Sequence, residues 1–423
     1  MKPSFIISSP FDTYSGYGAR SRDVIKAIVE TKKYDVKLLS QRWGNTPFGF
    51  CKDNPEWGFL LELVTPMPLT VQPEIWAQIT VPNEFQPVGK YNIGITAGIE
   101  TTLVPGEWIE GCNKMDLLLV SSEHSKQSFI KAEFEKRNSN QELLGKIKLD
   151  TPVEVLFEGA NLDVYKKLET PMTNDELFKS IDSIQESFAY LFVGHWMEGN
   201  LGEDRKNVGL LVKAFLETYK GKKKRPALIL KTSHVGASHM DRDSILSKIK
   251  AIKETVKSND LPNIYLIHGD FTDVEMNEIY NHKKIKAMVS LTKGEGFGRP
   301  LLEFSLSKKP IIVSGWSGHM DFLKPEYNII IGGNLTKVHE SVKNQFLLQD
   351  AEWFSPDHAS IGNAFQSVFK DYKKYKDLGK RQGYHSKENF SWDNMKNLLS
   401  SLLENNIPEF PKEISLQLPK LKK

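Results

Sequence analysis

The sequence predicts an α/β protein built from two doubly wound domains, each with a parallel sheet. The chain has 423 residues, which is too long for a single hydrophobic core. Strand-like apolar runs alternate with helical patterns in two separate series, and such alternation is typical of parallel sheets. The composition, 39% apolar and 26% charged, is that of an ordinary globular protein.

The first series occupies residues 1–165, which we expect to form an N-terminal Rossmann-like domain. Helix 20–31 carries Val24, Ile25, Ile28 and Val29 on one face, and a second helix is predicted at 125–136. Strands are predicted between and around these helices, at 5–8, 36–39, 75–81, 91–96, 117–120 and 153–156.

The second series occupies residues 188–385, and the polar segment 166–187, which has no clear period, is expected to be a linker. A helical stripe that begins at Trp392 predicts a core-facing helix within 386–423, followed by a basic tail. The predicted strands of this series are 190–193, 227–231, 264–267, 287–291 and 311–314, and its helices are 208–219, 244–257 and 273–280.

Charge and cysteine content narrow the class of protein. The net charge of +3 gives no general case for nucleic-acid binding. The basic clusters 222–225 and 420–423 fit a solvated surface and tail, with an anionic partner as the alternative. Cys51 and Cys112 suggest neither a disulfide framework nor a zinc site. Because there is no signal peptide and no apolar stretch of roughly 20 residues, we expect a cytoplasmic protein without a transmembrane segment.

The stretch from Gly294 to Glu303 (GEGFGRPLLE) carries most of the functional information. It follows the apolar run 285–291 and contains Pro300, so it reads as strand, glycine-rich loop and helix start. Glu295 then lies in the loop and Glu303 in the first turn of the helix or just beyond. Free amides at a helix start favour an anion, and carboxylates beside it can accept hydrogen bonds from hydroxyl groups. A phosphate linked to sugars fits both; a buried βα unit with two incidental surface glutamates is the alternative.

Glu295 and Glu303, with the glycines between them, resemble the E-x7-E signature of the retaining glycosyltransferases of group 1 (family 4), which adopt the GT-B fold. The pattern continues downstream in Lys309-Pro310-Ile311-Ile312-Val313-Ser314, Ser317-Gly318 and Asp321. The chain departs from the family at Ser305, Lys308 and Lys309, where small residues are usual. The resemblance covers residues 5–404 and implies two Rossmann-like domains facing across a cleft, with the C-terminal helix within 386–423 crossing back to the N-terminal domain. A nucleotide-diphosphate sugar would bind mainly to the C-terminal domain and the acceptor mainly to the N-terminal domain.

Two further segments are candidates for phosphate binding. Gly16 and Gly18 lie in a glycine-containing turn before the first helix, where a phosphate cradle and an ordinary tight turn are equally plausible from spacing alone; the resemblance places them at the donor diphosphate. Arg205 and Lys206 precede helix 208–219 and resemble the family's basic pair, although His195 stands where many members have arginine. The alternative is a solvated charge cluster at a helix start.

Three weaker candidates complete the predicted site. Glu100 lies in a segment that resembles the acceptor side of some family members, with a capping or turn role as the alternative. Gly269 and Phe271 follow the strand 264–267 and would contact the nucleobase. Histidine and carboxylate spacings suggest no metal site, so we expect a metal-independent reaction without a cofactor.

The resemblance also implies a role for each residue. Glu303 would hold the ribose and Glu295 the transferred sugar, and Gly296, Phe297 and Gly298 of the turn would bind the donor. Arg205 and Lys206 would bind the diphosphate. The expected reaction retains the anomeric configuration, with a glycan or, since similar chains occur in viral as well as bacterial genomes, a modified DNA base as acceptor. The alternatives are a sugar-nucleotide epimerase or phosphorylase and a non-catalytic sugar-nucleotide-binding module.

Overall fold

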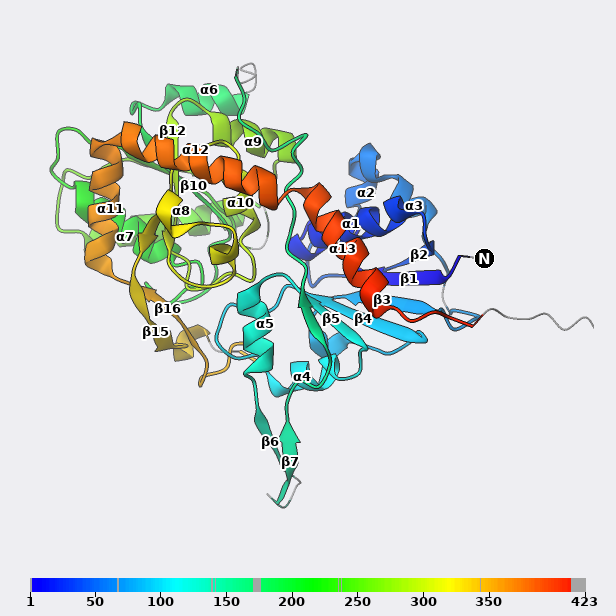
Figure 1. The fold of residues 1–423 in the computed structure, drawn as a ribbon. Helices are drawn as coiled ribbons and strands as arrows, with labels where there is room; N and C mark the ends of the chain where they lie inside the picture. The colour runs from blue at the N-terminus through cyan, green and yellow to red at the C-terminus, as the bar shows by residue number, and fades with distance from the viewer. Residues whose placement is uncertain are drawn as a thin grey trace, which may run out of the picture.

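The computed structural model describes residues 2–66, 68–137, 140, 142–169, 176–234, 236, 238–342 and 344–411. These residues form two lobes, each built around a parallel sheet with helices on its faces (Figure 1). The predicted α/β architecture with two parallel sheets is therefore confirmed.

The N-terminal sheet has the strand order β2-β1-β3-β4-β5-β8, and every neighbouring pair is parallel. Its central strands are buried because helices and loops cover both faces, as in parallel sheets generally. The strands are β1 (Ser4–Ser9), β2 (Asp35–Ser40), β3 (Ile75–Ile79), β4 (Tyr91–Thr96), β5 (Leu117–Val120) and β8 (Val153–Val155). The helices of this lobe are α1 (Gly16–Thr31), α2 (Phe50–Asp53), α3 (Phe59–Glu62), α4 (Gly106–Cys112) and α5 (Glu123–Ile130).

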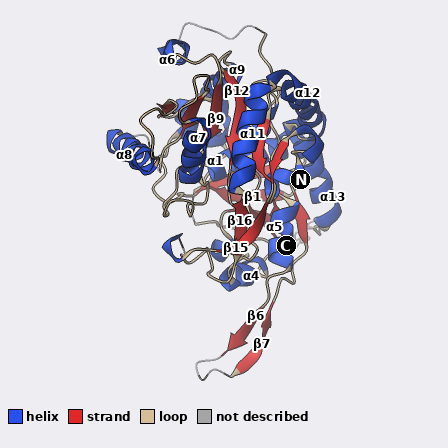
Figure 2. Cartoon of the chain, turned by 90° about the vertical axis from the view of Figure 1, so that its left-hand side faces the viewer, coloured by secondary structure: helices blue, strands red, loops and turns tan. Residues whose placement is uncertain are grey.

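The C-terminal sheet has the strand order β11-β10-β9-β12-β13-β14, again parallel throughout. Its strands are β9 (Ala189–Val193), β10 (Ala227–Lys231), β11 (Ile264–Ile267), β12 (Ile285–Ser290), β13 (Ile311–Ser314) and β14 (Ile329–Ile331). Helices α7 (Val208–Tyr219), α8 (His239–Thr255) and α11 (His358–Lys370) pack on one face. Helices α9 (Asp273–Asn281) and α10 (Arg299–Ser305) pack on the other. Figure 2 shows α7 and α11 lying along the strands.

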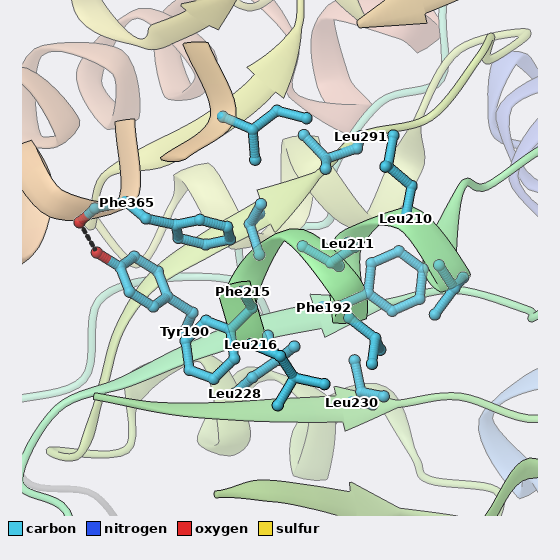
Figure 3. Close-up of a cluster of buried hydrophobic side chains, with 14 of the residues drawn as sticks. Tyr190, Phe192, Leu210, Leu211, Phe215, Leu216, Leu228, Leu230, Leu291 and Phe365 are labelled. Atoms are coloured by element: carbon cyan, nitrogen blue, oxygen red, sulfur yellow. Dashed lines mark hydrogen bonds between the residues drawn. The ribbon is translucent and has the colours of Figure 1, made fainter. Parts of the chain in front are cut away.

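The core between α7, α11 and the sheet is rich in aromatic side chains. Tyr190 of β9, Phe215 of α7 and Phe365 of α11 meet there, and the Tyr190 hydroxyl donates a hydrogen bond of 2.6 Å to the Phe365 carbonyl (Figure 3). This satisfies a polar group that would otherwise be costly to bury. The core holds the carboxyl ends of β9 and β12 in fixed positions.

The chain crosses between the lobes twice, and the two crossings lie side by side. The Ala160 amide donates to the Phe390 carbonyl at 2.9 Å, and the Trp392 amide donates to the Ala160 carbonyl at 2.8 Å. Helix α12 (Tyr372–Asn389) lies on the C-terminal lobe, whereas α13 (Trp392–Asn406) packs against α1 of the N-terminal lobe (Figure 1). The apolar stripe that begins at Trp392 thus completes the N-terminal core, through Met395, Leu399 and Leu403.

The segment 166–187 is more ordered than a simple linker where the structure describes it. Helix α6 (Glu176–Ser183) lies within it, and Ile181 and Ile184 are buried in the C-terminal core. The Leu168 amide donates to the Asn281 side chain at 2.9 Å, which attaches the segment to α9. Residues 170–175 lie outside the described residues.

The helix predicted at 125–136 is wrong in its second half. Helix α5 ends at Ile130, and β6 (Phe134–Arg137) pairs in antiparallel fashion with β7 (Leu143–Ile147). This hairpin projects from the N-terminal lobe (Figure 1). The charged run after Ile130 has helix propensity but no apolar stripe to pack, so strand pairing decides its conformation.

An antiparallel hairpin formed by β15 (Gly333–Lys337) and β16 (Glu352–Pro356) follows β14, in a region where the sequence predicted no element. The turn region of this interlobe hairpin (residues 333–356) reaches the N-terminal lobe. The Thr102 amide donates to the Glu352 carbonyl, and the Glu352 amide donates to the Thr102 hydroxyl, both at 2.9 Å. The rings of Phe346 and Trp108 also meet, with centroids 5.6 Å apart. The hairpin therefore joins the lobes at a second place, away from the crossing chain.

Candidate functional site

The glycine-rich turn lies at the carboxyl end of β12, at the junction of the lobes. The Glu295 amide donates to the Ser317 hydroxyl at 2.9 Å, and the Gly318 amide donates to the Glu295 carbonyl at 3.0 Å. The loop that follows β13 therefore holds the backbone on both sides of this carboxylate.

Two glycines of the turn are required by contact with the N-terminal lobe. A Cβ atom at Gly294 would lie 2.0 Å from the Glu100 carbonyl oxygen, and one at Gly296 would lie 2.5 Å from the Ala97 carbonyl oxygen. The Ser121 hydroxyl also donates to the Gly296 carbonyl at 3.1 Å. The glycine pattern thus has a packing reason beside the predicted phosphate contact, and sequence spacing does not separate the two.

The rest of the turn leads into α10. Gly298 has φ +97°, a left-handed conformation that favours glycine, and precedes the first residue of the helix. Pro300 is the second helical residue, one position later than predicted, and Glu303 lies just beyond the first turn, as predicted. The Phe297 side chain is buried and packs on Phe322 with centroids 5.0 Å apart. Only the Phe297 backbone is therefore available to a ligand.

Lys206 and Glu295 form a close, nearly buried ion pair. The Lys206 Nζ lies 2.5 Å from both carboxylate oxygens, and the side chains are 14% and 11% exposed. Burial would raise the pKa of Glu295, but Lys206 and Arg205 outweigh it and hold the pKa below its usual value. Burial also lowers the pKa of Lys206, against the effect of Glu295. The structure thus brings together two residues predicted from separate motifs.

Arg205 makes the corresponding ion pair across the lobes. Its NH1 lies 2.6 Å from Glu100 Oε1, with side chains 21% and 26% exposed. The Arg205 carbonyl accepts a hydrogen bond of 2.9 Å from the Lys293 amide, which ties it to the start of the glycine-rich turn. Arg205, Lys206, Glu100 and Glu295 therefore form one cluster at the carboxyl ends of β9, β12 and β4.

Glu303 is held by an arginine that the sequence analysis did not single out. Its Oε1 accepts from Arg299 Nε at 2.9 Å, and Arg299 NH1 lies 2.6 Å from Asp23 Oδ2 of α1 and 4.0 Å from Glu158 Oε2. Burial raises the pKa of Glu303 to about 8, although Arg299 acts in the opposite direction. Arg299 thus connects Glu303 of the C-terminal lobe to a carboxylate of the N-terminal lobe.

Gly16 and Gly18 lie in the first turn of α1, not in a loop before a helix at Arg20 as predicted. The Ser15 hydroxyl caps this helix by accepting from the Gly18 amide at 2.9 Å. A Cβ atom at Gly18 would lie 2.4 Å from the Thr13 carbonyl oxygen, so Gly18 serves the turn itself. A Cβ atom at Gly16 would have no described atom within 4 Å, which leaves room for a ligand.

Gly269 and Phe271 lie at the carboxyl end of β11, on the same sheet edge as Glu295 but separated from β12 by β10 and β9. Gly269 has φ +137°. The Lys231 Nζ lies 5.3 Å from the centroid of the Phe271 ring. These two residues belong to the edge of the predicted site.

His319 lies beside the turn but has a structural partner. It is fully buried, and its Nε2 is 2.7 Å from the Ser314 carbonyl oxygen. Burial lowers its pKa. Among the described residues, no group of three or more His, Cys, Asp or Glu side chains is placed to hold a metal ion. None of the helices in the described part of the chain has the length and apolar character needed to cross a membrane.

No family model and no curated protein sequence matches this chain. Solved structures do match over nearly the whole length. A glycosyltransferase from Rickettsia africae has a TM-score of 0.65 at 13% identity, covering 96% of this chain and 99% of that one. Sucrose-phosphate synthase from Thermosynechococcus elongatus has a TM-score of 0.60 at 12% identity, covering 96% and 99%. Anabaena HepE in complex with UDP-glucose has a TM-score of 0.61 at 12% identity, covering 95% and 100%. The chain therefore has the GT-B fold, with two facing Rossmann-like domains.

Proposed function

We propose that this protein is a retaining glycosyltransferase, which moves a sugar from a nucleotide-diphosphate sugar to an acceptor hydroxyl. The observation that carries the proposal is the cluster of Arg205, Lys206, Glu100 and Glu295 where the two lobes meet. Crevices at the carboxyl ends of parallel strands are the usual ligand sites of open α/β sheets. The similarity to structures named for glycosyl transfer, and to HepE solved with UDP-glucose, supports the same class of donor.

In this proposal Arg205 and Lys206 stabilise the departing nucleoside diphosphate. Both cations are paired with carboxylates, so a diphosphate competes with Glu100 and Glu295 for them. Negative charge grows on the leaving phosphate as the bond to the sugar breaks, so these cations act more strongly in the transition state than in the ground state. Burial of Lys206 strengthens that interaction because water screens it less.

The carboxylates orient the donor. Glu295 would accept hydrogen bonds from hydroxyls of the transferred sugar, and Glu303, oriented by Arg299, would accept them from the ribose. Gly16 would let the diphosphate approach α1, while the backbone of Gly296, Phe297 and Gly298 would line the sugar site. Gly269 and Phe271 would contact the base.

We further propose front-face substitution. The bond from the anomeric carbon to the leaving phosphate oxygen breaks while the acceptor oxygen bonds to the same face, and the leaving phosphate takes the acceptor proton. This route needs no metal or cofactor in addition to the donor. The acceptor would be a glycan or, as a second candidate, a hydroxylated DNA base.

The test is a panel of nucleotide sugars incubated with the protein, with release of free nucleotide as the measurement. A matched pair of variants controls the measurement. Lys206→Ala removes a cation of the cluster, which precedes α7, whereas Lys223→Ala removes an exposed lysine beyond the opposite end of that helix. We expect release by the wild type and Lys223→Ala, and much less by Lys206→Ala. A nucleotide-dependent rise in melting temperature without release would indicate a binding module, and a changed sugar still attached to its nucleotide would indicate an epimerase.

A further inference from the structure

A cavity of about 810 Å³ lies in the C-terminal lobe, between α7 and α11 and beside the interlobe hairpin. Its volume falls in the range of sites for small molecules. None of the residues assigned to the donor lines it. Its charged lining consists of Lys213, Lys293, Lys337, Glu203 and Glu217, together with the titratable His339 and His358.

Lys293 is the unusual member of this lining because it is 3% exposed. Its backbone is fixed on both sides: its amide donates to the Arg205 carbonyl, and its carbonyl accepts from the Phe354 amide, both at 2.9 Å. Its Nζ lies 5.1 Å from the centroid of the Trp353 ring. The side chain is thus held against an aromatic wall at the edge of the cavity.

The Lys293 ammonium has no close ionic partner among the described residues. Burial lowers the pKa of Lys293, and Glu203 and Asp204 oppose this from beyond ion-pair distance. Asp204 is engaged elsewhere, because its Oδ2 accepts from the Val208 amide at 2.9 Å and so caps α7. A buried cation without a hydrogen-bonded anion is unfavourable, and an oxyanion in the cavity would supply that partner.

We propose that this cavity binds a small phosphorylated polyol or sugar, with its phosphate on Lys293. Lys213 and Lys337 add positive charge around the phosphate, and Glu203 and Glu217 can accept hydrogen bonds from hydroxyl groups. Glu217 is already paired with Lys220, whose Nζ lies 2.5 Å from Glu217 Oε2. Glu203 has no ion pair within 4 Å among the described residues and would repel a bare anion, which favours a ligand that carries hydroxyls as well as a phosphate.

Such a ligand would act as an effector, because it binds outside the cluster of Arg205, Lys206, Glu100 and Glu295, which we call the donor cluster. Lys293 is adjacent to Gly294 in the chain and is hydrogen-bonded to the Arg205 carbonyl, so occupation of the cavity reaches the cluster through the backbone. The proposal does not depend on glycosyl transfer. If a nucleotide does bind the cluster, each ligand changes the affinity of the other by the same factor.

The experiment is calorimetric titration of the full chain with glucose 6-phosphate and glycerol 3-phosphate, compared with glucose, glycerol and inorganic phosphate. We expect at least one phosphorylated probe to bind more tightly than inorganic phosphate, and the neutral probes not to bind. Lys293→Met should weaken that binding by about tenfold or more, the scale of a lost hydrogen bond to a charged group. Ala359→Trp, an exposed position of α11 that lines the cavity, should weaken it by filling the space while Lys293 stays intact.

Lys206→Ala separates this site from the donor cluster. We expect it to leave binding of the phosphorylated probe unchanged. Loss of probe binding in Lys206→Ala but not in Lys293→Met would place the ligand in the donor cluster and overturn the proposal. Equal binding of inorganic phosphate, or no binding of either phosphorylated probe, would overturn it as well. Nucleotide release by the same variants tests glycosyl transfer independently.

Discussion

Replacement of Arg299 by methionine should destabilise the protein strongly, because it removes the cation shared by three carboxylates. Arg299 lies 2.6 Å from Asp23, 2.9 Å from Glu303 and 4.0 Å from Glu158. The four side chains are between 9% and 20% exposed. Loss of one partner of a buried ion pair costs about 3–5 kcal/mol. Because partial exposure screens this network, we expect a loss near the lower limit, about 3 kcal/mol at pH 7.

The loss should grow with pH. Burial raises the pKa of Glu303 to about 8 and also raises the pKa of Glu158 above its usual value. Without Arg299 both pKa values rise further, although Arg20 still opposes the rise at Glu158. The folded state then binds more protons than the unfolded state, so stability falls as the pH rises from about 4 through the raised folded pKa values. In the wild type, Glu303 already makes stability fall as the pH rises, because its pKa is raised to about 8. The difference between wild type and Arg299→Met should therefore be larger at pH 8 than at pH 5.5.

Urea denaturation, followed by circular dichroism at pH 5.5 and at pH 8, measures the free energy of unfolding of the wild type and of Arg299→Met. Arg242→Met is a matched control because the Arg242–Asp243 pair is 3.9 Å apart and 53% and 73% exposed; such surface pairs contribute about 0–1 kcal/mol. Addition of Asp23→Asn to Arg299→Met should recover part of the loss. If Arg299→Met costs no more than Arg242→Met, or costs the same at both pH values, the network does not stabilise the lobe contact.

Other predictions concern the donor cluster. Lys206→Ala should lower kcat by on the order of 100-fold, the scale of one lost electrostatic stabiliser; normal turnover would show that the Lys206–Glu295 ion pair is structural and takes no part in the reaction. Nucleotide affinity measured by calorimetry should rise up to about tenfold from pH 7 to pH 9 as Glu303, with its pKa of about 8, ionises. Glu303→Gln should remove this dependence, and an unchanged pH profile would exclude Glu303 from the nucleotide site. Gly16→Val should abolish nucleotide binding with little loss of stability, since its side chain enters open space; Gly18→Val, which meets the Thr13 backbone, should destabilise the protein instead.

The sequence predicted the buried parts of the fold well. Helix α7 has the predicted bounds because its sequence combines a helical period with a buried apolar face. Strand β10 has them because it is a short apolar run that is buried up to Lys231. The interlobe hairpin gave no such signal. Strand β15 is exposed along its whole length, so its conformation depends on pairing with β16 and not on an apolar pattern.

The sequence predicted those parts of the site whose residues follow neighbouring strands of the same sheet. Arg205, Lys206 and Glu295 follow parallel neighbouring strands, so their proximity follows from topology. The contact of Arg299 with Asp23 spans 276 residues and depends on how the lobes meet. The spacing of residues within a motif carries no information about such a contact between the lobes. The same holds for Gly294 and Gly296, whose packing partners belong to the other lobe.

Two arginines couple the lobes, and each also contacts or adjoins a residue that we propose to bind the donor. Arg205 reaches Glu100 across the junction and adjoins Lys206 in the chain, while Arg299 reaches Asp23 and orients Glu303. A change in lobe spacing therefore alters the charges that surround the donor, and a ligand that takes Arg205 from Glu100 removes one tie between the lobes. Because binding and lobe geometry share these contacts, each must influence the other by the same free energy. Under the proposed function, donor affinity is thus a property of both lobes together.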